Sequence, residues 1–155
     1  MCKPVLIVLA AFACTTLTSG CSSMNNIGSL ADVSSFADLP QQILGNWKLD
    51  SLKGFDLSQL AGNDLGLPNV GFQSDGNVAG FSGVNRFAGK VDVAQLAQGK
   101  FSLPNAASTR MAGSPVASDL ESKFLGALSS ADGAKIDGGK LLLSKGGETL
   151  MSFVR

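Results

Sequence analysis

The stretch "LLLSKGGETLMSF", residues 141–153, is the part of the sequence that most constrains the fold. It consists of two apolar runs joined by a pair of glycines, and glycine readily adopts the positive φ that a two-residue hairpin turn requires. Such a turn sets Lys145 opposite Glu148 and predicts that Leu142 faces Met151 on the neighbouring strand. Both faces of the hairpin are apolar, which predicts burial on two sides, as in the middle of a small barrel.

Turn signals recur about every 8–12 residues along the rest of the chain, which favours an antiparallel sheet over a helical fold. Residues 53–68 contain several glycines and are predicted to form an irregular loop. The predicted strands span residues 46–52, 70–73, 78–81, 87–93, 100–103, 140–144 and 148–154.

One segment, residues 114–130, has the pattern of a helix. Its apolar side chains recur at every fourth position and form a stripe that would pack on the sheet. These side chains are Val116, Leu120, Phe124 and Leu128. The helix begins either at Ser114, which precedes a proline, or one turn later at Ser118, which forms a capping box with Glu121. The predicted fold class is mainly β (α+β), a small antiparallel sheet or barrel-like domain with one packed helix.

The N-terminal 20 residues have the layout of a secretory signal peptide. Lys3 supplies a positive charge, residues 5–13 form an apolar run, and small residues precede Cys21. The apolar run is too short to cross a bilayer, because a spanning helix takes about 20 apolar residues. The sequence therefore predicts export from the cytoplasm.

Residues 17–21, Leu-Thr-Ser-Gly-Cys, resemble a bacterial lipobox, in which the cysteine is acylated and becomes the new N-terminus. Thr18 departs from this pattern, because an aliphatic residue is commonest there. The alternative is an ordinary cleaved signal that leaves Cys21 as an oxidisable thiol. We expect Cys21 to be lipidated, since buried acyl chains contribute about 0.8 kcal/mol per methylene and anchor a protein without a transmembrane helix. Ser22, where aspartate would favour inner-membrane retention, points to the outer membrane and the periplasm.

The predicted organisation is a lipoprotein signal peptide over residues 1–20, a flexible tether over 21–44 and one domain over 45–155. The start of the tether is rich in Ser, Asn and Gly, as flexible linkers are. An alternative is that apolar tether residues, among them Phe36 and Ile43, dock on the domain. Cleavage before Cys21 removes the other two cysteines, so no disulfide is expected within the domain.

Composition excludes several classes of function. The chain has 12 basic and 12 acidic residues and no basic run, so nucleic-acid binding is not expected. It contains no His and no Tyr, which removes the commonest general base, the commonest metal ligand and every His-dependent triad. A calcium-loop-like stretch begins at Asp75, but Ala79 and Arg86 stand where oxygen ligands are needed. We expect no catalytic residue, no metal and no cofactor.

The middle of the chain, "PNVGFQSDGNVAGFSGVNRFAGKVDV" followed by "FSLPNAASTRMAG", resembles the META domain, also called the heat-shock protein HslJ family. The family pattern has an early Trp-x-Leu, then Gly-x-x-Gly-Cys-Asn-x-Phe-x-Gly, then Thr-x-Met-Ala-Cys, a helix bearing Glu and a closing hairpin. The resemblance covers residues 45–154 and implies association with heat or envelope stress and no established catalytic activity. The matching residues are Trp47, Leu49, Gly80, Gly83, Asn85, Phe87, Gly89, Thr109, Met111, Ala112 and Glu121.

Two departures from the family pattern stand out, because Val84 and Gly113 occupy positions where many relatives have cysteines. Their joint absence indicates that the two positions adjoin in the fold, with apolar packing in place of a sulfur contact. We therefore expect no thiol-based redox role for the mature domain.

The resemblance places Trp47 and Phe87 on strands. Together with the helix stripe and the hairpin, it predicts one shared core. The predicted core residues are Trp47, Phe87, Leu120, Phe124, Leu142, Met151 and Phe153.

Four polar residues of the family motifs form a candidate binding site: Asn85, Arg86, Thr109 and Arg110. The alternative is that Asn85 and Thr109 satisfy buried backbone groups while the arginines lie on the surface or pair with acids such as Asp75. We expect this structural interpretation. Trp47 is likewise expected in the core rather than as a ligand platform.

The expected function is that of a non-enzymatic, membrane-anchored envelope lipoprotein with a structural, stress-related or partner-binding role. Its expected partners are a membrane, through the N-terminal lipid, and an unidentified protein. The alternative is a binding module for a small apolar ligand or an inhibitor of a secreted enzyme, which an open apolar cavity would favour and a filled interior would oppose. A hydrolase is the third class, but Glu121 and Glu148 fall on a helix face and a hairpin end.

Overall fold

The computed structural model describes residues 36–60 and 66–155. Cys21, the predicted signal peptide and residues 22–35 of the predicted tether lie outside this part of the chain. The elements are η1 (Phe36–Asp38), α1 (Leu39–Gln42), β1 (Gly45–Leu52), η2 (Leu57–Leu60), β2 (Asn69–Phe72), β3 (Asn77–Phe81), β4 (Arg86–Lys90), α2 (Val93–Leu96), β5 (Ala107–Ser108), α3 (Pro115–Ser130), β6 (Gly133–Asp137), β7 (Lys140–Lys145) and β8 (Glu148–Val154).

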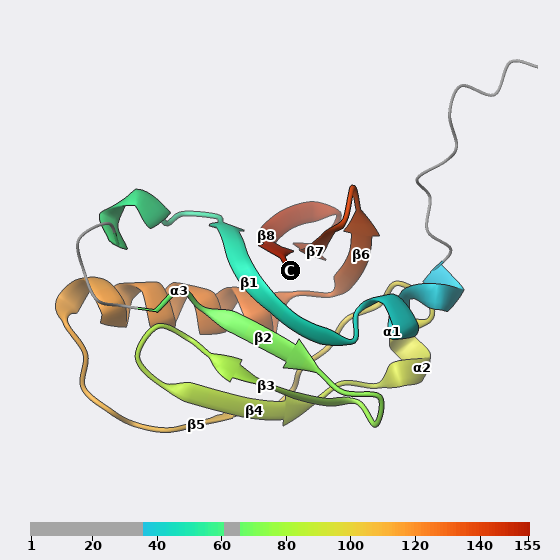
Figure 1. Cartoon of the computed structure of the whole chain (residues 1–155), viewed down its shortest axis with the longest axis horizontal. Coiled ribbons are helices and arrows are strands. Elements are labelled where there is room, and N and C mark those ends of the chain that lie inside the picture. The colour runs from blue at the N-terminus through green and yellow to red at the C-terminus, as the bar shows by residue number, and fades with distance from the viewer. Residues whose placement is uncertain (1–35, 61–65) are drawn as a thin grey trace, which may run out of the picture. The chain divides into compact units, whose positions relative to one another are not determined.

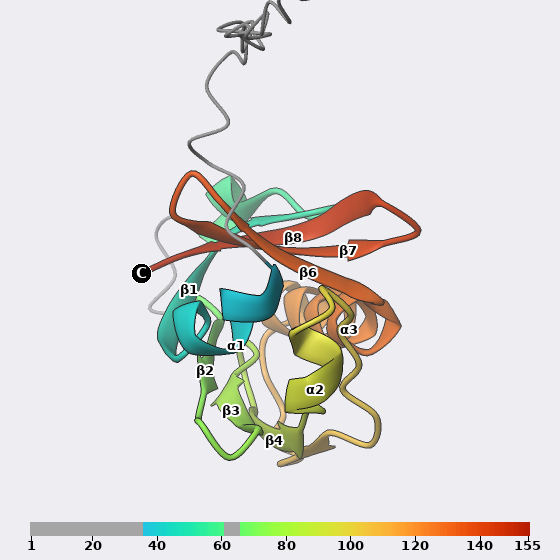
Figure 2. The ribbon, with the colours of Figure 1, turned by 90° about the vertical axis from the view of Figure 1, so that its right-hand side faces the viewer.

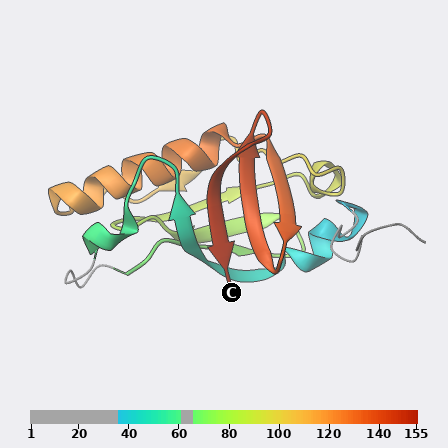
Figure 3. The same ribbon diagram turned by 90° about the horizontal axis from the view of Figure 1, so that it is seen from above.

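The strands form one antiparallel sheet in the order β5-β4-β3-β2-β1-β8-β7-β6. The predicted mainly β fold is confirmed. The sheet curls so that β2–β4 lie on one side of α3 and β6–β8 on the other (Figures 1 and 2). Seen from above, the orange and red strands cross over the green ones (Figure 3). The two edge strands, β5 and β6, do not pair with each other, so the sheet is open and the barrel-like alternative is not confirmed.

Strand β1 joins the two halves of the sheet. It pairs with β2 through Gly45–Lys48 and with β8 through Lys48–Leu52. The β8 ladder shifts register between Leu49 and Ser51, and such a bulge increases the local twist of a strand. The single strand can therefore serve both halves while the sheet bends around α3.

The helix α3 fills the concave side of the sheet. Ser114 is its N-cap and accepts a hydrogen bond from the backbone of Ala117, so the start at Ser114 is confirmed and the start at Ser118 is wrong. Leu120, Phe124 and Leu128 are buried as predicted. The ring of Phe124 lies 5.8 Å from that of Phe87 and 6.2 Å from that of Phe153, which ties the helix to both halves.

The closing hairpin has the predicted turn, with φ of 56° and 86° at its two glycines, and it pairs Lys145 with Glu148. The predicted contact between Leu142 and Met151 is wrong. A register shift next to Leu143 sets Leu143 opposite Met151 and leaves Leu142 half-buried. The reason is a bulge: β8 contains one more residue than its partner along this stretch, which moves the following side chains by one position.

The predicted core is otherwise confirmed. Six of the seven residues predicted for it are at most 2% exposed: Trp47, Phe87, Leu120, Phe124, Met151 and Phe153.

Two strand predictions need correction, and two short strands were missed. β4 ends at Lys90, before the predicted residue 93, because the Asp92 carboxylate accepts from two backbone amides and starts the short helix α2. Residues 100–103 form only a bridge from Lys100 to Gly133 instead of a strand. The short strands β5 and β6 were not predicted.

The domain begins before the predicted boundary at residue 45. Residues 36–42 form η1 and α1, and both Leu39 and Ile43 are buried in the core. Arg155 holds this segment in place, because its guanidinium donates to the carbonyls of Gln42 and Leu44 and lies 4.7 Å from the centre of the Trp47 ring. Residues 36–44 therefore belong to the domain and not to a flexible tether.

Candidate functional site

The centre of the candidate site is Asn85, which directly precedes β4 and is 5% exposed. Its Oδ1 accepts from the Met111 N–H at 2.7 Å and from the Thr109 hydroxyl at 2.8 Å. Its Nδ2 donates to the Met111 carbonyl at 3.2 Å and to the Glu121 carboxylate at 2.9 Å. An asparagine amide offers two donors and two acceptor positions, so the hydrogen-bonding capacity of Asn85 is fully used.

Two further residues, Ser82 and Glu121, complete this network, and neither was among the site residues predicted from the sequence. The Ser82 hydroxyl donates to the Glu121 carboxylate at 2.7 Å, and the Ser82 N–H donates to the Asn85 carbonyl at 2.8 Å. Glu121 comes from α3, so the network joins that helix to the β3–β4 loop and to the segment after β5. The helix glutamate of the family pattern was the available signal for Glu121, and nothing in the sequence distinguished Ser82.

Thr109 binds the start of β4 as well as Asn85. Its N–H donates to the Arg86 carbonyl at 3.0 Å, and its hydroxyl accepts from the Arg86 N–H at 3.2 Å. Asn85 and Thr109 therefore organise the backbone, as the structural interpretation predicted.

The two arginines of the candidate site are exposed, as that interpretation also predicted. The ion pairs of residues 36–60 and 66–155 involve other basic side chains, and neither arginine takes part in one. The proposed partner Asp75 instead accepts from the backbone of Asn77 at 3.0 Å. The structure thus brings the four predicted residues together, with two of them engaged in the protein and two cations facing solvent.

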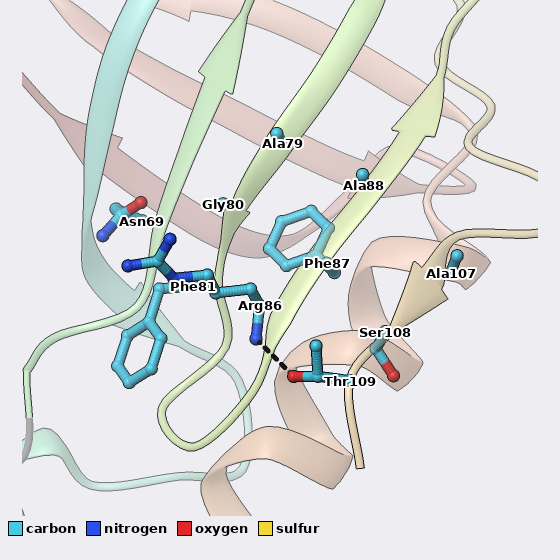
Figure 4. Close-up of a pocket in the computed structure, with 10 residues that line it drawn as sticks. All are labelled: Asn69, Ala79, Gly80, Phe81, Arg86, Phe87, Ala88, Ala107, Ser108 and Thr109. Atoms are coloured by element: carbon cyan, nitrogen blue, oxygen red, sulfur yellow. Dashed lines mark hydrogen bonds between the residues drawn. The ribbon is translucent and has the colours of Figure 1, made fainter. Parts of the chain in front are cut away.

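A hollow of about 840 Å³ lies on the outer face of the sheet beside Arg86. Its floor is made of small side chains from three neighbouring strands, because Ala79 pairs with Ala88 and Ala88 pairs with Ala107. Phe81 lies directly across from Arg86 at one end (Figure 4). The hollow therefore combines an apolar floor, two aromatic side chains, Phe81 and Phe87, and the charge of Arg86, which forms no ion pair with the described residues.

A second hollow, of about 420 Å³, lies between the segment after β5 and the helix α3. Ser108 and Thr109 line both hollows, so β5 forms the ridge between them. The other lining residues of the second hollow are mostly polar and include Arg110, Ser118, Glu121 and Ser122.

The space between sheet and helix is occupied by large side chains, among them Trp47, Phe124 and Phe153. Trp47 donates from its indole N–H to the Ile43 carbonyl at 2.7 Å, which confirms its place in the core. In the described part of the chain no three His, Cys, Asp or Glu side chains gather where they could hold a metal ion. The same residues contain no helix of the length and apolarity needed to cross a membrane.

Two carboxylates with perturbed acidity lie elsewhere. Hydrogen bonds from Lys140 and Ser152 lower the pKa of Asp50, which sits at the bulge of β1. Hydrogen bonds from Ser58 lower the pKa of Asp56. Both carboxylates form hydrogen bonds with structural partners and lie outside the candidate site.

Val84 and Gly113 adjoin, as their joint departure from the family pattern predicted. A β-carbon placed on Gly113 would collide with the Val84 side chain. Apolar packing of valine against a bare backbone occurs at the two positions where the family pattern has cysteines.

The fold and the Asn85 network define the class of this protein as a small antiparallel β domain with one helix fixed across its open sheet. The chain belongs to the META domain family, whose model matches residues 41–155. An NMR structure of a protein from Burkholderia xenovorans is 19% identical with a TM-score of 0.56, covering 77% of this chain and 87% of that one. A second NMR structure is 20% identical with a TM-score of 0.57, covering 74% and 92%. Both show the fold alone. No curated protein matches the chain.

Proposed function

We propose that this protein is a non-enzymatic lipoprotein of the bacterial cell envelope whose META domain binds a partner protein. In this proposal acylated Cys21 anchors the protein in the outer membrane, and the domain faces the periplasm. The anchor rests on the lipobox-like residues 17–21 and on the signal-like run before them. A role in envelope stress follows from the family resemblance.

The observation that supports partner binding is that some polar residues of the candidate site bond within the protein while others are exposed. The polar atoms of Asn85, Thr109 and Glu121 form hydrogen bonds within the protein, which fix the loop before β4 and the segment after β5. Arg86 and Arg110 remain exposed beside two hollows. Fixed backbone next to free cations provides a preorganised binding surface, which reduces the entropy lost on association.

A small apolar ligand is the second candidate. The filled interior opposes a site between sheet and helix, but the outer hollow has a volume within the roughly 300–1,000 Å³ typical of ligand pockets. Titration of the protein with an anilinonaphthalene sulfonate dye tests this, because binding there should be lost when Ala88 on the hollow floor is replaced by Trp. Dye binding that Ala88→Trp leaves unchanged would rule the outer hollow out as the ligand site.

The anchor is tested by fractionation and mass spectrometry. The full chain should be found in the membrane fraction with an acylated N-terminal Cys21. Cys21→Ala should release the domain into the soluble fraction or leave it unprocessed. An exported chain with an unmodified Cys21 would contradict the anchor.

Partner binding is tested by cross-linking in intact envelopes followed by capture of the lipidated protein. We expect a protein that is cross-linked to the wild type and reduced in Arg86→Gln/Arg110→Gln. The matched control is Lys145→Gln, which removes an exposed charge from the distant β7–β8 turn. Equal recovery with all three proteins would show that the candidate site does not bind the partner.

A further inference from the structure

We propose that the exposed edge of β5 binds an acidic, extended segment of a partner protein as an added β-strand. The inference rests on the partner-binding part of the proposed function and is independent of the lipid anchor. It assigns the binding surface, the mode of binding and the chemical class of the partner segment.

The backbone next to β5 is held as an open strand edge. The N–H of Thr109 points inward to the Arg86 carbonyl. Two residues on, the N–H and C=O of Met111 both point inward to the amide of Asn85, which takes the place of a peptide unit of a neighbouring strand. Backbone groups alternate in direction along a strand, so the N–H and C=O groups of Ser108 and Arg110 point away from the sheet.

These outward groups are accessible. Every residue from 104 to 115 is exposed, and β5 ends the sheet with no described strand on its far side (Figure 1). β5 consists of only two residues, but the hydrogen bonds of Thr109 to Arg86 and of Met111 to Asn85 continue the edge beyond it. An unpaired edge of this kind is a template for pairing with another chain.

The opposite edge of the sheet is protected. The first residues of β6 bond to the segment after α2, since the Ala134 N–H donates to the Gly99 carbonyl and the Phe101 N–H donates to the Asp132 carbonyl. Lys135 and Asp137 form an ion pair along the rest of β6. Charged side chains and covering segments are the usual means of blocking an edge, and β5 has neither.

The two hollows match the alternation of an added strand. Side chains of such a strand point in turn to opposite faces of the sheet. One row would lie beside Ala107 at the rim of the outer hollow, while the other row would enter the polar hollow beside Ser118 and Ser122. In strand addition the backbone gives affinity and such alternate pockets give specificity.

Charge selects an acidic segment. Arg86 and Lys90 are the only charged residues of β2, β3, β4 and β5, and neither belongs to an ion pair of the described residues. Exposed Arg110, which follows β5 along the same edge, adds a third cation without an ion pair among the described residues. An acidic added strand would therefore be attracted by this positive charge, whereas a basic strand would be repelled.

The probe is a fluorescein-labelled, capped heptapeptide in which threonine alternates with valine and glutamate. Two control peptides replace glutamate by lysine or N-methylate the backbone amides on one edge. Binding to the full chain in detergent is followed by fluorescence anisotropy up to about 1 mM, the weak end of specific association. We expect the glutamate peptide to bind, the lysine peptide to bind about tenfold more weakly, and N-methylation to abolish binding.

Protein variants test the contributions of the backbone hydrogen bonds and of the charge separately. Ser108→Pro removes an outward N–H and should abolish binding, and Arg86→Gln should weaken it about fivefold. Lys145→Gln should leave it unchanged. The N-methylated peptide tests the backbone without altering the protein, so a folding defect in Ser108→Pro does not decide the outcome. No binding at 1 mM, or binding that survives N-methylation, would overturn the proposal.

Vesicles of phosphatidylglycerol test an anionic lipid surface instead. Vesicle binding that Arg86→Gln weakens and Ser108→Pro leaves intact, with no peptide binding, would replace the proposal by a lipid contact. Envelope cross-linking distinguishes the two levels of inference. A partner that is captured equally by the wild type and by Ser108→Pro would support partner binding and exclude strand addition. Peptide binding without any captured envelope partner would support strand addition and count against the proposed partner in the envelope.

Discussion

The β-carbon of Val84 lies 3.3 Å from the place where a β-carbon on residue 113 would be, so the valine side chain occupies the space that Gly113 leaves open. This single relationship explains why the two positions change together relative to the family pattern. A larger residue at 113 needs a smaller or bonded partner at 84.

Gly113→Ala should lower the free energy of unfolding by about 1 kcal/mol, because the new methyl group collides with Val84. Gly126→Ala is the matched control. Gly126 is exposed on α3 with nothing near its would-be β-carbon, so alanine should stabilise the helix by roughly 0.5–1 kcal/mol. Urea unfolding measures both, and shifts of the same sign would contradict this account.

Val84→Cys/Gly113→Cys should form a disulfide, since the separation of the β-carbons is close to the roughly 3.5–4.5 Å that disulfides require. Closing the loop between the two positions should stabilise the oxidised domain by about 3.5 kcal/mol. Thiol titration and urea unfolding with and without reductant provide the measurement. The wild type, which has no cysteine in the domain, should unfold identically in both conditions.

Asn85→Ala should lower the free energy of unfolding by about 3 kcal/mol, because it removes the buried amide that makes four hydrogen bonds to Thr109, Met111 and Glu121. The neighbouring substitution Arg86→Gln should change it by less than about 0.5 kcal/mol, since that side chain is exposed and unpaired. Chemical denaturation of both variants is the measurement. Similar losses would mean that the network does not fix the site.

Phe124→Ala should lower the free energy of unfolding by about 3–5 kcal/mol, because the ring contacts Phe87 in one half of the sheet and Phe153 in the other. Lys123→Ala removes only an exposed ion pair with Asp119 and a cation 5.5 Å from the Phe55 ring, so it should cost about 1 kcal/mol or less. Equal effects would show that α3 does not pack as described.

The lowered pKa of Asp50 predicts a dependence of stability on pH. Lys140 donates to this carboxylate at 2.8 Å and Ser152 at 3.0 Å, which favours the ionised form in the folded state. A lowered folded pKa gives stability that is present above the ordinary value near 3.8 and is lost as pH falls through the folded pKa. Acid unfolding should therefore be steeper in the wild type than in Asp50→Asn or Lys140→Gln. Parallel curves for all three would exclude Asp50 as the source.

The sequence predicted the elements whose signals are local. The glycine pair defined the closing turn, and the four-residue spacing defined the stripe of α3. The predictions that were wrong concerned features that depend on distant contacts or on single residues. The bulge beside Leu143 shifts the register without any mark in the apolar pattern, and β5 is too short for alternation to reveal it. Asp92 is a residue type that commonly caps helices, but it lies inside the apolar run that was predicted to be a strand.

At the candidate site, the motif residues Asn85 and Thr109 could be located from the sequence, and so could their structural role. Their geometry could not. The hydrogen bonds that extend the edge to Met111 depend on how a loop and a separate segment meet, which no spacing along the chain encodes. The hollow likewise arises from alanines on three strands that only the register brings together.

The position of β1 between β2 and β8 has a consequence for folding. Ser51 and Ser152 bond to each other across 101 positions of sequence at the middle of the sheet. During synthesis from the N-terminus, β1 can pair with β2 early but must keep its other edge unpaired until β8 has been made. Contacts this distant slow folding, to the millisecond-to-second range typical of non-local β topologies. That delay would favour the export that we propose, because a chain that is still unfolded can cross a membrane.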